Sequence, residues 1–144
     1  MSLELKNIEK KAGIETHIHP TNLKLDKNTI NVLLGSTLAG KTTLMQIMAG
    51  LDKPTSGEIW FNGENVTGKE VQKRNCSMVY QQFINYPNFT VFENIASPLK
   101  ITGVNSNEIK ERVGKVAELL KLSAMLNKKP DELSGGQQQR TALA

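Results

Sequence analysis

The stretch LLGSTLAGKTTLMQIMAG, residues 33–50, decides the fold that the rest of the chain has to accommodate. A short apolar run leads into a loop with glycines at positions 35 and 40, and the loop ends in Lys41-Thr42-Thr43 where a helical pattern begins. This stretch matches G-x-x-x-x-G-K-[ST], a loop whose backbone N–H groups surround phosphate oxygens while the helix N-terminus adds its positive dipole end. The sequence therefore predicts a nucleoside triphosphate site on a strand–loop–helix unit.

Each residue of this loop is a candidate for nucleotide binding. Lys41 is predicted to reach the outer phosphates, and the Thr42 hydroxyl is predicted to bind Mg²⁺. The two glycines permit the tight turn and the close approach of the ligand. An ordinary glycine-rich turn is the alternative, and the strand before the loop and the helix after it favour the nucleotide site. The predicted binding residues of the loop are Gly35, Ser36, Thr37, Leu38, Ala39, Gly40, Lys41, Thr42 and Thr43.

The composition is that of one globular domain with a dispersed positive charge. The chain has 144 residues and a net charge of +4 at pH 7. Its lysines are scattered, so we expect them to solvate the surface and predict no nucleic-acid partner. The one cysteine, Cys76, excludes an intramolecular disulfide, and we expect it to be a small core residue. No apolar signal region and no apolar run of ~18 residues occurs, so we expect membrane contact only through partners.

Apolar patterns predict strands in the first half of the chain. Alternating residues indicate half-buried strands, and the β-branched-rich run INVLL indicates a fully buried one. The strands are predicted at residues 3–5, 22–25, 30–34, 58–61 and 76–80. Residues 26–29 and the pair Asn62-Gly63 are predicted to be turns.

Helical patterns dominate the second half. The first predicted helix, residues 42–49, follows the glycine loop and is capped by Gly50. A helix from residue 91 is predicted to end before Pro98, and residues 107–122 form an apolar stripe with Ser106 as the N-cap. Ser134 is predicted to open the last helix. We therefore divide the chain into a β-rich nucleotide-binding part (residues 1–82), a helical part (residues 83–133) and the start of a further helix (residues 134–144).

A second candidate anion site lies at that last helix. In LSGGQQQR, residues 133–140, Ser134 and Gln137 have the S-x-x-Q spacing of a capping box. Gly135 and Gly136 add free N–H groups at the same helix N-terminus. Two phosphate-binding helix termini in one chain indicate either two ligands or one ligand shared between two chains.

These two motifs together resemble those of the ATP-binding subunits of ABC transporters. GSTLAGKTT resembles their Walker A loop and LSGGQ their signature. MVYQQ, followed by YPNFTVFENIASPLK, is similar to the Q-loop segment of carbohydrate and glycerol-phosphate importers of the maltose type. The resemblance implies an α/β P-loop NTPase fold of the ABC ATPase type. That fold would combine an antiparallel β-subdomain, a partial parallel core sheet and an α-helical subdomain, and this chain would stop before the Walker B strand.

The resemblance also implies a function and its residues. The family's subunits bind ATP and Mg²⁺ and power solute transport from the cytoplasmic face of the membrane. Gln81 would position Mg²⁺ and the attacking water. Ser134, Gly135, Gly136 and Gln137 would contact the γ-phosphate of ATP held by a second copy in a head-to-tail dimer. Residues 83–100 would contact the transmembrane permease subunits.

Three departures from the family pattern shape the expectations. Leu38 stands where the family has a glycine, and Ala12 stands where it has an adenine-stacking aromatic, with only His17 and His19 nearby. The catalytic glutamate of the family would follow LSGGQ and is absent here. We therefore expect weak ATP binding, no turnover by these residues alone, and exposed apolar surface or self-association. Two alternatives stay open: an ABC-class ATPase that acts on nucleic acid or ribosomes, and a nucleotide-binding or interaction fragment without hydrolysis.

Overall fold

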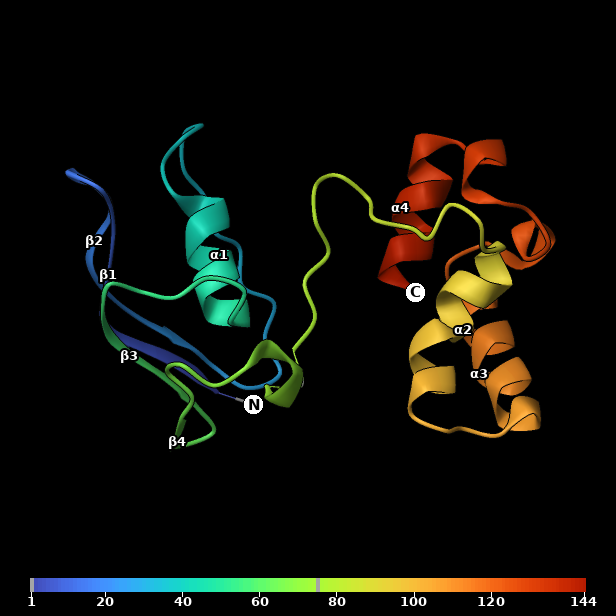
Figure 1. Cartoon of the computed structure of the whole chain (residues 1–144), viewed down its shortest axis with the longest axis horizontal. Helices are drawn as coiled ribbons and strands as arrows, with labels where there is room; N and C mark the ends of the chain where they lie inside the picture. Colours follow the sequence, from blue (N-terminus) through green and yellow to red (C-terminus); the bar gives the residue numbers. More distant parts are fainter. Residues whose placement is uncertain (1, 75) are drawn as a thin grey trace. The chain divides into compact units, whose positions relative to one another are not determined.

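The computed structural model describes residues 2–74 and 76–144, which form two compact units, Met1–Met78 and Val79–Ala144. The first unit contains the four-stranded sheet, the loop and the first helix (Figure 1). The second unit contains the remaining α-helices.

The sheet of the first unit is antiparallel throughout its described strands. Its strands are β1 (Leu3–Ala12), β2 (Glu15–Leu25), β3 (Ser56–Phe61) and β4 (Glu64–Asn65), in the order β2-β1-β3-β4. The strands predicted at residues 3–5, 22–25 and 58–61 are therefore confirmed. Asn62 and Gly63 have φ of 51° and 83°, so the predicted turn between β3 and β4 is confirmed as a turn that needs positive φ at both positions.

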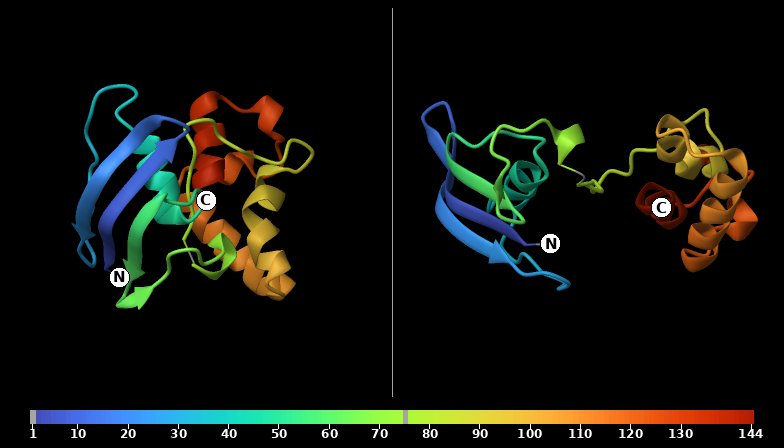
Figure 2. Two further views of the ribbon diagram at one scale, coloured as in Figure 1. Left: turned by 60° about the vertical axis from the view of Figure 1, so that its left-hand side comes forward. Right: turned by 90° about the horizontal axis from the view of Figure 1, so that it is seen from below.

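The core of this unit lies between the sheet and helix α1 (Lys41–Ala49), which covers one face of the sheet (Figure 2). Leu44 and Ile47 on α1 pack against buried side chains of the strands. The strand and connecting residues of this cluster are Leu5, Ile8, Ile18, Ile59 and Val66. Burying one such aliphatic side chain stabilises the fold by about 1.5–3 kcal/mol, so this contact fixes α1 on the sheet.

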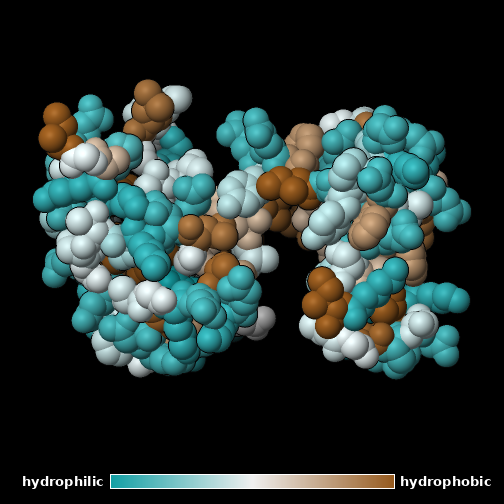
Figure 3. Space-filling view, viewed as in Figure 1, coloured by the Kyte–Doolittle hydropathy of each residue, from teal (hydrophilic) through white to brown (hydrophobic). Residues whose placement is uncertain are grey.

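Two predicted buried strands are wrong in the described residues. Residues 30–34 and 76–80 form no strand, and Ile30 is 97% exposed. The predicted core residue Cys76 is also exposed. A strand must pair its N–H and C=O groups with a neighbouring strand, and none of the described strands pairs with either run. The expected partial parallel sheet is therefore not formed in the described residues, and apolar side chains stay on the surface (Figure 3).

The second unit is a helical cluster around its own core. Its helices are α2 (Val91–Ile101), α3 (Ser106–Leu119) and α4 (Gly135–Leu143), with 3₁₀ turns at Ser123–Met125 and Pro130–Glu132. The stripe predicted for α3 is confirmed at Ile109, Val113 and Ala117, which are buried. The core also contains Val91, Ile95, Ala96, Leu122 and Leu133. Among the described residues, no helix is both long and apolar enough to span a bilayer.

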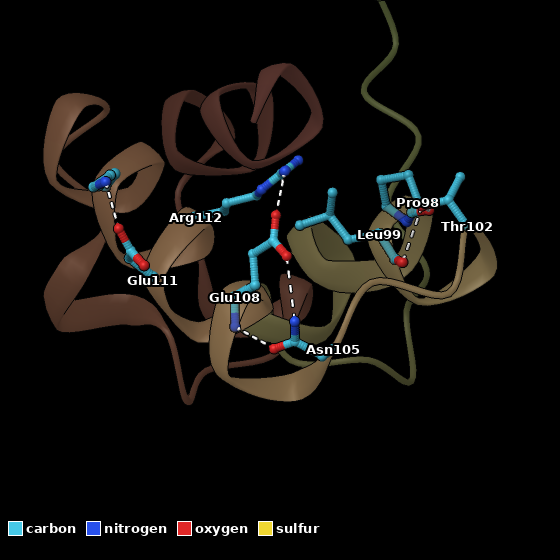
Figure 4. Close-up of polar contacts among 8 residues, drawn as sticks. Pro98, Leu99, Thr102, Asn105, Glu108, Glu111 and Arg112 are labelled. Atoms are coloured by element: carbon cyan, nitrogen blue, oxygen red, sulfur yellow. Dashed lines mark hydrogen bonds and ion pairs between the residues drawn. The ribbon is translucent and has the colours of Figure 1, made fainter.

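Two predicted helix boundaries in this unit are wrong. Helix α2 continues through Pro98 instead of ending before it. Proline has no N–H for the carbonyl of Asn94, and the Ser97 hydroxyl donates to that oxygen at 2.9 Å instead. The N-cap of α3 is Asn105 and not Ser106, because Asn105 Oδ1 accepts from the Glu108 N–H at 2.9 Å (Figure 4).

Candidate nucleotide-binding site

The loop that precedes α1 is an exposed turn. Gly35 to Ala39 are exposed, and the Ala39 N–H donates to the Ser36 carbonyl at 3.3 Å. Gly40, the N-cap of α1, has φ of 79°. A Cβ there would lie 2.7 Å from Ile18 Cδ1, so only glycine lets the loop rest this closely on β2. The turn is therefore fixed at its helix end and open to ligand at its tip.

Leu38 lies at that tip in a left-handed conformation. Its φ is 68°, and its side chain is 98% exposed. A residue with a Cβ is disfavoured in this region by about 1–2 kcal/mol, and an exposed side chain makes no packing contact that offsets the cost. The glycine of the family pattern would carry no such strain here.

Lys41 lies at the mouth of the loop. Its Nζ donates to the carbonyls of Gly35 at 2.8 Å and Ser36 at 2.5 Å. These bonds hold the ammonium against the loop carbonyls, next to the N–H groups at the start of α1. An ammonium has three donors, so the two bonds leave one free for a ligand.

The N-terminus of α1 is also free to accept an anion. Gly40 provides no side-chain cap, and the first turn contains no acidic residue. The Thr42 side chain is exposed and makes no hydrogen bond within the described part of the chain. Unpaired N–H groups, the positive dipole end and a free hydroxyl are what a phosphate–metal ligand requires.

A pocket of about 280 Å³ lies beside this loop. Its lining from β2 and the following segment is His17, Ile18, His19, Thr21, Leu33 and Leu34, and its lining from the loop and α1 is Ala39, Gly40, Lys41 and Leu44. Among these residues there is no Phe, Tyr or Trp and no carboxylate. The structure thus places His17 and His19 beside the predicted phosphate site, and no ring that stacks in the manner of the family's aromatic lines the pocket.

The signature residues form the N-terminus of α4 in the second unit. Ser134 is the N-cap, and the predicted capping box with Gln137 is confirmed: Ser134 N–H donates to Gln137 Oε1 at 2.8 Å, and Ser134 Oγ accepts from Gln137 N–H at 3.4 Å. A Cβ added at Gly136 would meet nothing within 4 Å, and one at Gly135 would lie 3.8 Å from the Phe83 ring. These glycines are therefore not required by packing within the described chain, and they leave an open approach to the helix N-terminus.

Gln81 is exposed and belongs to the second unit, whereas the loop and Thr42 belong to the first. Four residues after Gln81, Asn85 Nδ2 donates to the Gln138 carbonyl of α4 at 3.0 Å. Sequence reasoning missed this contact, because a contact between segments about 50 residues apart has no local sequence pattern.

Residues 83–100, which include most of α2, present exposed apolar side chains in the segment before that helix. Ile84, Tyr86 and Phe89 are exposed, and the Tyr86 and Phe89 rings lie 5.2 Å apart. The Asn94 side chain fixes this turn: its Oδ1 accepts from the Tyr86 N–H at 2.8 Å, and its Nδ2 donates to the Tyr86 carbonyl at 3.2 Å. These hydrogen bonds of the Asn94 side chain were not foreseen from the sequence either.

The profile of the ABC transporter family matches residues 18–144. The chain belongs to this family. The match covers both the loop before α1 and the signature at α4, so the ABC ATPase fold is confirmed.

Several ABC proteins are similar to the chain over nearly all of its length. The Fe(3+) ions import ATP-binding protein FbpC of Vibrio cholerae is 41% identical over 97% of the chain and 40% of its own length. The sulfate/thiosulfate import ATP-binding protein CysA of Mesostigma viride is 41% identical over 100% of the chain and 41% of its own length. The spermidine/putrescine import ATP-binding protein PotA of Haemophilus influenzae is 39% identical over 99% of the chain and 38% of its own length. The chain thus spans about two fifths of the length of these relatives.

A solved ABC structure has the same fold. The ATP-binding cassette MJ0796, a dimer in a post-hydrolysis state bound to ADP and Pi, superposes with a TM-score of 0.87 at 30% identity. The match covers 98% of this chain and 67% of that one.

Proposed function

We propose that this chain is the nucleotide-binding part of an ATP-binding subunit that powers solute import by an ABC transporter. The observation that carries the proposal is the uncapped N-terminus of α1, with Lys41 Nζ held at the mouth of a glycine loop. Import is supported by relatives whose names include iron, sulfate and polyamine import. None of these three is named for a carbohydrate, so the maltose-type assignment rests on the sequence resemblance alone.

ATP would be bound by the loop, Gly35 to Thr43, with Lys41 donating to the outer phosphates. Mg²⁺ would be held by the Thr42 hydroxyl, whose exposure supports this role, and by Gln81. When bound, the metal neutralises phosphate charge. Gln81 would also orient the attacking water. The pocket beside Lys41 contains no carboxylate, which supports nucleotide binding without turnover by this chain's own described residues.

A second ATPase subunit would complete the site. Ser134, Gly135, Gly136 and Gln137 would meet the γ-phosphate of ATP bound by the partner in a head-to-tail dimer. The open space at Gly136 and the dimeric cassette MJ0796 support this arrangement. We propose the same three parts as above: residues 1–82 bind nucleotide, residues 83–133 form the helical part, and residues 134–144 carry the signature.

Residues 83–100 would dock on the permease subunits. This proposal is supported by the exposed apolar side chains of Ile84, Tyr86 and Phe89, in a turn that the Asn94 side chain holds by hydrogen bonds. An exposed apolar cluster on a stiff turn is typical of a protein-binding surface. The subunit would then lie in the cytoplasm, at the inner face of the membrane, with its membrane contact made through the permease.

Calorimetric titration with MgATP tests the binding proposal. We expect heat of binding for the natural chain and none for Lys41→Ala, because the variant loses the cation at the loop. Lys53→Ala serves as the matched control, since this exposed lysine lies after α1 and away from the pocket lining. Equal heats from the natural chain and Lys41→Ala would refute the proposal.

Sedimentation with and without MgATP tests the shared site. Gly136→Ala is compared with Gly114→Ala, because a Cβ at either helical glycine meets nothing within 4 Å. Both changes should raise stability slightly by removing a helical glycine. Only Gly136→Ala should abolish a nucleotide-dependent dimer, and a dimer that survives it would exclude the signature from the contact.

A further inference from the structure

A buried guanidinium lies at the end of α1 opposite to the loop. Arg74 is only 7% exposed and follows the 3₁₀ turn Val71–Lys73. Its Nη1 donates to the carbonyls of Ile47 and Met48, both at 3.4 Å, and its Nε donates to the Lys69 carbonyl at 3.2 Å. All three acceptors are backbone oxygens, and two of them belong to the last turn of α1.

No carboxylate lies within ion-pair distance of Arg74 in the described part of the chain. Burial lowers the pKa of this guanidinium from its ordinary value, because desolvation disfavours the charge. A buried cation without a counter-ion is costly and persists only where it makes other favourable interactions. Helix α1 has no basic residue in its own last turn, so Arg74 supplies the cation that the negative end of its dipole favours.

Gly50 leaves the space that the Arg74 side chain occupies. This residue ends α1 with φ of 85°, and an added Cβ would lie 2.5 Å from Arg74 Nε and 2.7 Å from Cζ. Glycine is therefore required twice at this position, for the left-handed cap and for the room that the guanidinium occupies.

We propose that Arg74 is a positioning residue for nucleotide binding, which holds α1 from its C-terminal end so that Lys41 and Thr42 keep their phosphate-binding geometry. The inference rests on the function proposed above. Helix α1 has nine residues, about two and a half turns, and helices this short depend on tertiary contacts for their stability. Gly40 packed on β2 fixes one end, and Arg74 fixes the other. When the last-turn carbonyls lose their donor, the helix loosens cooperatively, and the N–H groups that receive phosphate lose their order.

Hydrogen exchange tests this without any nucleotide. The Leu44 N–H donates to the Gly40 carbonyl at 2.9 Å at the phosphate end of α1, and the Leu51 N–H donates to the Gln46 carbonyl at 2.9 Å at the other end. In Arg74→Ala we expect faster exchange at both amides. A change confined to Leu51 would show a purely local cap and overturn the proposal. Lys73→Ala is the matched control, because this neighbouring side chain is exposed and pairs with Glu70.

Nucleotide affinity gives the second readout. A cation at a helix C-terminus is typically worth about a two- to fivefold change in an equilibrium constant, so we expect Arg74→Ala to bind MgATP that much more weakly. The MgATP affinity of Arg74→Lys, which keeps the charge with fewer donors, should lie between those of the natural chain and Arg74→Ala. If the alanine variant does not fold, Arg74→Lys replaces it in both assays. Tens of millimolar guanidinium chloride should restore the affinity of Arg74→Ala, whereas sodium chloride should not.

The outcomes separate this inference from the proposed function. Unchanged affinity in folded Arg74→Ala, or no rescue by guanidinium, overturns the positioning role and leaves the binding proposal intact. The same guanidinium concentration should not rescue Lys41→Ala, which lacks the phosphate-binding cation itself. If the natural chain binds no more MgATP than Lys41→Ala, the proposed function fails, and the exchange at Leu44 still decides whether Arg74 orders the phosphate end of α1.

Discussion

Replacing Leu38 by glycine should make the protein more stable, and the physical reason lies in one backbone angle. Leu38 has φ of 68° and a side chain that is 98% exposed, so the change removes strain and almost no packing. The strain of a Cβ in this region is about 1–2 kcal/mol. Glycine loses about 0.5–1 kcal/mol more than alanine in conformational entropy on folding. The expected net gain in the free energy of unfolding is therefore about 0–1.5 kcal/mol, with a middle value of about 0.75 kcal/mol.

Leu38→Ala is the control that isolates the strain. Alanine keeps the Cβ and loses only exposed atoms, so its stability should stay within about 0.5 kcal/mol of the natural chain. At an unstrained exposed position glycine would be less stable than alanine, and at a position that needs positive φ the order is reversed. Urea unfolding followed by the fluorescence of Trp60, the single tryptophan, on β3 of the same unit, measures both variants. The reasoning would be refuted if Leu38→Gly were no more stable than Leu38→Ala.

The same pair of variants separates folding from binding. If the free loop already holds residue 38 at positive φ, the strain is present with and without nucleotide and cancels from the affinity. If the free loop relaxes to negative φ, nucleotide must restore the strained form, and Leu38→Gly binds more tightly. Because the structure holds residue 38 at positive φ, we expect the stability to change and the MgATP affinity to stay within about twofold. A tenfold gain in affinity would contradict a preformed loop.

The remaining predictions concern the two units separately. The Lys10 hydrogen bond at 2.6 Å lowers the pKa of Asp52. This ion pair should therefore stabilise the fold, by at most about 1 kcal/mol, above the pKa of about 3.9 that Asp52 has in the unfolded chain. The stabilisation should be lost as the pH falls through the lower pKa that Asp52 has in the folded chain. In urea unfolding, Asp52→Asn should have a lower free energy of unfolding than the natural chain near neutral pH, and this difference should vanish in acid. A difference that does not change with pH would contradict the prediction. Thr90→Ala should cost about 1 kcal/mol by removing the N-cap of α2. The Thr90 N–H, which is the larger cause of the lowered Glu93 pKa, stays in this variant, whereas the Thr90 hydroxyl bond is lost, so the pKa of Glu93 should rise only part of the way, and an unchanged pKa in an NMR titration would disprove this. Gly57→Ala should cost more than about 2 kcal/mol, since its Cβ would lie 2.3 Å from a carbonyl oxygen of β1, and a normal melting temperature would be inconsistent with this close approach.

Local features of the sequence determined the helix caps on either side of the candidate site. The Gly50 cap of α1 and the capping box at Ser134 each depend on residues within four or five positions of one another. Sequence spacing therefore predicted them correctly. The hairpin at Asn62-Gly63 was predictable for the same reason, because its positive φ values are properties of the two turn residues themselves.

Tertiary structure alone decided the features that depend on distant partners. The run at residues 30–34 has the composition of a buried strand, yet the described structure gives it no neighbour to pair with, and pairing is non-local. Helix α2 passes Pro98 because a neighbouring hydroxyl satisfies the freed carbonyl, a compensation that proline statistics do not anticipate. Arg74 reaches the end of α1 across more than 20 residues of chain. Short-range spacing in the sequence determined the caps and turns. The packing of remote segments decided which runs form strands and which side chains are buried, because burial and backbone pairing depend on contacts that no short window of sequence contains.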